Sequence, residues 1–181
     1  MKWFFIVIFL TLTQCWGNTP ADSGATTYVV KGKRYKTQAH YNYAKAGLAS
    51  WYGPKFHMKK TASGEIYNQY HYTAAHRTLP LNTIVRVTNL HTKKSVLVLI
   101  SDRGPYPSTK HKGCRYMYKK RLIDLSYAAA KKLDGLKQGV FPVQVVSLPA
   151  ESRKFAQMIQ LLKKKQKKNF SVSREFHRIY T

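Results

Sequence analysis

The sequence predicts a small, mostly β domain that closes into a barrel, with one or two short helices and a basic, partly helical C-terminal tail. From Gly47 onward, short apolar or alternating segments are separated by turn residues, a texture typical of β domains. The length of 181 residues allows one domain plus tails. A hydrophobic content of 44% suffices for a buried core and argues against global disorder.

The charge is strongly positive: 32 Lys and Arg against 7 Asp and Glu give a formal net charge of +25. Such a field attracts nucleic acid, acidic lipid headgroups or anionic cell-surface polymers. Met1 and Lys2 are followed by an apolar run over 3–12, which is too short for a bilayer span of about 20 residues and fits a secretory signal. Export to the periplasm is therefore expected, and nucleic acid is not expected as a partner.

Two cleavage sites fit the predicted signal peptide, residues 1–17. Residues 12–15 (LTQC) resemble a lipobox, in which Cys15 would be lipidated and would anchor the protein to the outer membrane. Gln14 departs from that pattern, because a small residue is usual before the cysteine. The alternative is ordinary cleavage after Gly17. Either cut leaves Cys114 without a disulfide partner in the mature chain.

Residues 18–46 are assigned to a linker and an N-terminal arm. Residues 28–35 form either a short hairpin around Gly32 or an arm lying on the domain. The barrel domain is assigned to 47–148, with strands over 48–52, 84–89, 95–100 and 140–148. The turn over 89–94 joins the second and third of these as a hairpin. A short helix is expected over 127–133, capped by Asp124 or Ser126 and ended by Asp134-Gly135.

The tail, 149–181, starts with Phe155, Met158, Ile159 and Leu162 at the i, i+3, i+4, i+7 spacing of a helix. It carries nine Lys and Arg and two acids. Two interpretations remain open. It is either an amphipathic basic element for an anionic membrane or polymer, or a solvated tail with one helical segment packed on the domain.

Asp102 is the acid in the most defined position, directly after the buried run 95–100 and followed by Gly104 and Pro105. A rigid strand holds the group at its end in a fixed position, as an active site requires of its functional side chains. Three regions carry further motif residues. They are GLASWYGPKFH at 47–57 with TASGE at 61–65, TAAHRTLPL at 73–81, and DRGP at 102–105 with LIDLS at 122–126.

Together these motifs resemble the rare lipoprotein A family over about residues 28–148. The resemblance implies a six-stranded double-psi β-barrel and a lytic transglycosylase of peptidoglycan in cell-wall remodelling. It implies cleavage of glycan strands lacking stem peptides, without water or a cofactor, to give 1,6-anhydro-muramoyl ends. The family's functional trio falls on Glu65, His76 and Asp102.

The chemistry suits these residue types. Glycosidic cleavage needs a proton on the leaving oxygen, and when the sugar's own 6-hydroxyl is the nucleophile, one carboxyl can give a proton and later take one. We expect Asp102 to be this acid/base and Glu65 to raise its pKa or stabilise the intermediate. His76 would hold the 6-hydroxyl or another sugar hydroxyl, or share the proton. The structural alternatives are an Asp102–Arg103 ion pair, a solvated Glu65 and a structural His76. Asp124 is interpreted as a helix or core anchor.

Substrate contacts are assigned to Trp51, Tyr52, Ser63 and Arg103. Because neighbours on a strand point to opposite faces, we expect one of Trp51 and Tyr52 in the core and the other in the groove. The family usually has Asn at the position of Ser63. It also lacks the stretch 106–120, which with Arg121 holds six Lys and Arg and forms either a basic lid beside the cleft or a disordered insertion.

Three rival functions remain. An expansin-like, non-catalytic wall-binding module would keep the fold without the chemistry. A hydrolase would use water and leave a different end group. A basic surface protein would bind anionic lipid or envelope polymers in a salt-sensitive manner that ignores Asp102.

Overall fold

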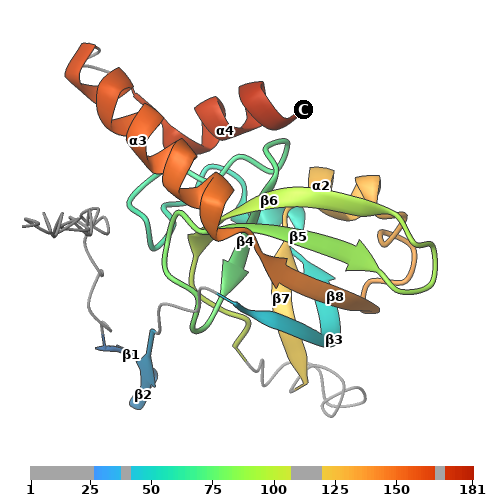
Figure 1. Cartoon of the computed structure of the whole chain (residues 1–181). Helices are drawn as coiled ribbons and strands as arrows, with labels where there is room; N and C mark the ends of the chain where they lie inside the picture. The colour runs from blue at the N-terminus through green and yellow to red at the C-terminus, as the bar shows by residue number, and fades with distance from the viewer. Residues whose placement is uncertain (1–26, 38–41, 107–119, 166–169) are drawn as a thin grey trace, which may run out of the picture.

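The computed structural model describes residues 27–37, 42–106, 120–165 and 170–181 (Figure 1). The predictions for the signal peptide, for lipidation of Cys15, for the linker up to residue 26 and for Cys114 lie outside these residues. So does the prediction for the basic insertion, apart from its two ends.

Six strands of the described chain close into a barrel in the order β3-β7-β4-β6-β5-β8, which confirms the predicted architecture (Figure 1). The β3–β7 and β4–β6 pairs are parallel and the other four are antiparallel. The strands are β3 (Ala44–Trp51), β4 (Thr73–His76), β5 (Ile84–Asn89), β6 (Ser95–Asp102), β7 (Arg121–Leu125) and β8 (Phe141–Ser147).

The predicted strands agree best where apolar residues alternate. β5 has the expected bounds, and β6 runs two residues beyond the expectation, so Asp102 is its last residue. β4 and β7 were missed. β4 (TAAH) is buried at all four positions and shows no alternation, and β7 (RLIDL) carries two charges. Neither pattern indicates a strand by itself, because these segments become strands only through pairing with the adjacent strands of the barrel.

The barrel core is filled by alternating residues of the strands, such as Phe141, Val143 and Val145 of β8, each at most 1% exposed. Helix α2 (Tyr127–Lys132) covers part of this core with Ala129 and Ala130. The Ser126 hydroxyl accepts the Ala129 N–H, so Ser126 and not Asp124 caps the helix.

Gly135 lies where α2 returns to the barrel, against the ring of Phe141. A Cβ at this position would stand 2.1 Å from Cε1 of Phe141, whose side chain is packed in the core and 1% exposed. We expect Gly135→Ala to lower the free energy of unfolding by about 3 kcal/mol, measured by urea denaturation. Gly53→Ala is the matched control, because a Cβ there would have no atom within 4 Å apart from its own residue and chain neighbours, and its φ is −68°. Equal stability of the two variants would contradict this account.

The N-terminal arm is a hairpin that also lies on the domain, so both sequence interpretations hold. β1 (Thr27–Val30) pairs with β2 (Lys33–Lys36) across a turn at Lys31 and Gly32, whose φ values are 49° and 75°. The Tyr28 hydroxyl donates to the Arg77 carbonyl at 2.7 Å.

The tail forms two helices that lie together on one side of the barrel (Figure 1). Helix α3 (Pro149–Lys165) buries Phe155 and Ile159, two of the predicted residues. Helix α4 (Val172–Tyr180), which was not predicted, buries Phe176 completely against the same cluster. The interpretation as a solvated tail with one packed helical segment therefore understated the packing. Within the described residues, the helices are too short or too polar to cross a membrane.

Candidate active site

A cavity of about 550 Å³ opens beside the ends of β3 and β6 and the start of β7. This volume lies in the usual range for small-molecule sites. Its described lining combines aromatic and charged side chains. The aromatic residues are Trp51, Tyr52, Phe56 and Tyr106, and the charged residues are Asp102, Arg103, Arg121 and Asp124.

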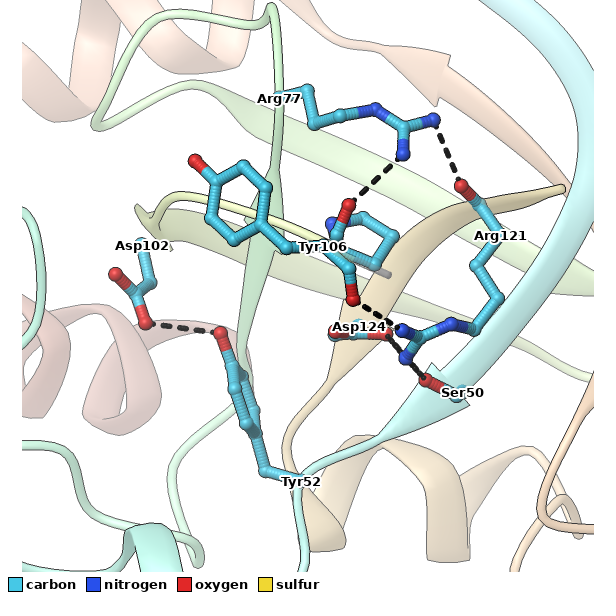
Figure 2. Close-up of polar contacts among 8 residues, drawn as sticks. Ser50, Tyr52, Arg77, Asp102, Tyr106, Arg121 and Asp124 are labelled. Atoms are coloured by element: carbon cyan, nitrogen blue, oxygen red, sulfur yellow. Dashed lines mark hydrogen bonds and ion pairs between the residues drawn. The ribbon is translucent and has the colours of Figure 1, made fainter. Parts of the chain in front are cut away.

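Asp102 lines this cavity and is held by three donors, of which Figure 2 shows Tyr52. Its Oδ1 accepts the N–H groups of Ala62 at 2.9 Å and Arg103 at 2.8 Å. Its Oδ2 accepts the Tyr52 hydroxyl at 2.9 Å. Strand β6 fixes the backbone and these donors fix the carboxylate, so the acid is presented in one orientation.

The Tyr52 hydroxyl acts as a hydrogen-bond donor to Asp102. Burial raises the pKa of the Tyr52 hydroxyl well above its usual value, and the negative charges of Asp102 and Asp124 raise it further. The phenol therefore stays protonated at physiological pH. The rings of Phe56 and Tyr67, at centroid distances of 5.2 and 5.1 Å, hold the Tyr52 ring in place.

Asp124 is a second carboxylate of the same cavity (Figure 2). Its Oδ1 accepts Arg121 Nη1 at 2.8 Å and the Ser50 hydroxyl, and the Arg121 and Asp124 side chains are only 9% and 14% exposed. Burial raises the pKa of the Asp124 carboxyl, and the charge of Arg121 opposes that rise. The predicted anchoring role fits this ion pair, although Asp124 does not cap α2.

Two arginines brace the segment that follows Asp102 (Figure 2). Arg77 donates to the carbonyls of Pro105 and Arg121, both at 2.9 Å. Arg121 Nη2 donates to the Tyr106 carbonyl at 3.0 Å. The cavity wall from Arg103 to Tyr106 is therefore tied to β4 and β7.

Glu65 lies outside the cavity. It is absent from the described lining, and its carboxylate accepts the N–H groups of Val172 and of Ser173, the latter at 3.0 Å. These two residues begin α4. The structure thus brings Glu65 to the C-terminal helix and not to Asp102.

His76 is also absent from the described lining and is 2% exposed. Its Nδ1 accepts the N–H groups of Thr78 at 3.2 Å and Leu79 at 3.0 Å. The proton of the neutral ring therefore belongs on Nε2, which lies 2.9 Å from the Tyr43 hydroxyl. The catalytic roles assigned to Asp102, Glu65 and His76 remain predictions, and only Asp102 lines this cavity.

The predicted substrate contacts divide unevenly. Trp51 and Tyr52 both line the cavity, with Trp51 also packed on the core, so the expected split between core and groove is wrong. Arg103 lines it too, but its Nη1 donates to the Leu79 carbonyl at 2.6 Å, and burial lowers the pKa of its guanidinium. Ser63 instead donates its N–H to the Ser101 carbonyl.

The sequence interpretation missed Ser50, Tyr106 and Arg121. Ser50 meets Asp124 because β3 pairs with β7 in parallel, a pairing that no local pattern signals, whereas Arg121 and Asp124 lie three residues apart on β7 itself. Among the described residues, no group of three or more His, Cys, Asp or Glu is placed to hold a metal ion.

Comparison with known proteins matches residues 44–145 to a family described as lytic transglycolase. An endolytic peptidoglycan transglycosylase RlpA of Helicobacter pylori (strain J99 / ATCC 700824) is 46% identical over 122 residues, 67% of this chain and 35% of that protein. The RlpA of Rickettsia bellii (strain RML369-C) is 42% identical over 143 residues, 77% and 58% of the two chains. A Streptomyces papain inhibitor matches 59% of this chain and 94% of its own, with 20% identity and a TM-score of 0.42. The chain thus matches less than two thirds of the length of either RlpA.

Proposed function

Because the chain belongs to the lytic transglycolase family, we propose that it cleaves peptidoglycan glycan strands at the Asp102 cavity and leaves 1,6-anhydro-muramoyl ends. The observation that carries this proposal is the single fixed orientation of Asp102, held by three donors at the wall of a cavity of small-molecule size.

The reaction needs two proton transfers through one carboxyl group, which first gives a proton and then takes another. The acid protonates the leaving glycosidic oxygen as the bond to the anomeric carbon breaks. The 6-hydroxyl of the same sugar then attacks that carbon, and its proton returns to the carboxylate. No water enters the balance. Asp102 is the proton carrier in this proposal.

The other carboxylate of the cavity is engaged by partners of its own. Asp124 Oδ1 is already committed to Arg121 and Ser50, whereas Asp102 lies at the end of a strand beside aromatic rings. Phe56, 49% exposed, and Trp51 offer faces for sugar packing.

The cellular setting belongs to the same proposal. The apolar run over 3–12 supports export, and the LTQC sequence supports a lipid anchor on Cys15 at the outer membrane. The net charge of +25 supports contact with anionic envelope polymers. Cleavage can be separated from these contacts by assaying a purified chain in which Cys15 is replaced, in the presence of salt. The replacement removes the lipid anchor, and the salt screens the attraction to anionic polymers.

Digestion of glycan strands free of stem peptides tests the proposal, with products identified by mass spectrometry. We expect anhydro ends, which are lighter by one water than reducing ends. Reducing ends would instead indicate a hydrolase. Binding without products would indicate an expansin-like module, and binding that salt abolishes would indicate a charge-driven surface protein.

A further inference from the structure

The loop of residues 58–67 is a stiff support between Asp102 and the C-terminal helix. Its ends are joined by hydrogen bonds from Met58 N to the Tyr67 carbonyl (2.9 Å) and from Tyr67 N to the Lys59 carbonyl (2.7 Å). Its tip is closed by Thr61 N to the Glu65 carbonyl at 2.8 Å. The tip of residues 61–65 therefore moves as one body.

One side of this tip touches the end of β6. The Ser63 N–H donates to the Ser101 carbonyl at 3.1 Å, and the Ala62 N–H donates to Asp102 Oδ1 at 2.9 Å. The tip thus supplies one of the two N–H groups on that oxygen.

The other side of the tip touches α4 through the Glu65 carboxylate. The Ser171 hydroxyl accepts the N–H of Arg174, the third residue of α4. Glu65 accepts the N–H groups of the first two, Val172 and Ser173. A negative charge at a helix N-terminus is also favoured by the helix dipole, so Glu65 completes the cap.

Helix α4 is itself fixed to the barrel. Phe176 is fully buried beside Phe155, at a ring distance of 5.5 Å, in a cluster with Ile84 of β5 and Leu99 of β6. A second contact joins His177 and His71, whose rings stack at 5.1 Å. The contacts therefore form a closed circuit. They run from Leu99 of β6 to Phe176 of α4, from α4 to Glu65 of the loop, and from the loop back to Asp102 at the end of β6.

We propose that Glu65 is a positioning residue, whose carboxylate ties α4 to the loop that holds Asp102. The proposal rests on the proposed function of the Asp102 cavity, and it makes the C-terminal helix a required part of the active site. Both carboxylate oxygens of Glu65 are engaged by α4, so its effect on cleavage reaches the substrate through Ala62 and Asp102.

The first test is Glu65→Ala. We expect kcat to fall about 10- to 100-fold through misplacement of the acid, with KM unchanged. Hydrogen exchange should accelerate at the Ala62, Val172 and Ser173 amides and stay unchanged in β5. Glu65→Gln keeps an acceptor oxygen and should restore part of kcat. Glu175→Ala is the control, because Glu175 lies on the same helix and pairs with the exposed Arg178.

The second test loosens α4 without altering Glu65. Phe176→Ala should reproduce the loss of kcat, whereas Ile179→Ala, at a position 40% exposed on the same helix, should not. Two results would overturn the proposal. One is full activity or a gain of activity in Phe176→Ala. The other is a loss in Glu65→Ala as complete as that in Asp102→Asn while Phe176→Ala is unaffected.

The exchange measurement separates this proposal from the proposed function. If the native chain does not cleave glycan strands, faster exchange at the Ala62 amide in Glu65→Ala still supports the tie. Unchanged exchange at that amide overturns it whatever the activity.

Discussion

Asp102→Asn is expected to remove glycan cleavage almost completely, with kcat falling about 100- to 10,000-fold. Asparagine has nearly the same shape as aspartate, and its amide oxygen can still accept the N–H groups of Ala62 and Arg103. It cannot give a proton to the leaving oxygen or take one from the 6-hydroxyl. The fold should therefore survive while the chemistry stops.

Product release from glycan strands, followed by mass spectrometry, measures this effect, and a thermal melt checks the fold. Asp134→Asn is the matched control: its carboxylate is 51% exposed, pairs with Lys94 and is not part of the described cavity lining. Cleavage by Asp102→Asn near the native rate would remove Asp102 from the mechanism. Binding of strands by Asp102→Asn would show that the cavity still accepts substrate.

The parts of the fold that could be predicted are those fixed by local pattern. The β5–β6 hairpin follows from alternation over 84–89 and an apolar run over 95–100, and it leads directly to Asp102. β8 follows from alternation over Phe141–Ser147. The six-stranded form of the barrel came from the family resemblance, because β4 and β7 have no strand signal of their own.

The site was predictable to a smaller extent, because its contacts join distant segments. Asp102 was found because it ends a strand. The partners of Glu65 lie more than 100 residues away on α4, a helix that the sequence interpretation overlooked although Val172, Phe176 and Ile179 follow helical spacing. The surroundings of His76 depend on a backbone turn that donates two N–H groups to one ring nitrogen, and no spacing in the sequence encodes that.

Arg121→Met is expected to lower the free energy of unfolding by about 3–5 kcal/mol near neutral pH, because it leaves the Asp124 carboxylate buried and unpaired. The side chain keeps much of its volume, so a cavity does not explain the loss. Denaturant unfolding measures it. Arg178→Met is the control, because Arg178 is 66% exposed in its ion pair with Glu175 and such pairs contribute at most about 1 kcal/mol.

The pH dependence identifies the cause of that loss. Burial already raises the pKa of the Asp124 carboxyl, and removal of the Arg121 charge raises it further. A carboxyl whose pKa is raised by folding destabilises the fold once pH rises through the folded-state pKa, and costs nothing below the unfolded value of about 4. The deficit of Arg121→Met should therefore be largest near pH 7 and shrink as pH falls toward 4.

Asp124→Asn added to Arg121→Met should recover most of the stability at pH 7, because the neutral amide removes the unpaired charge. A deficit that is independent of pH, or that Asp124→Asn does not relieve, would show that the packing of the Arg121 side chain dominates and that the ion pair does not.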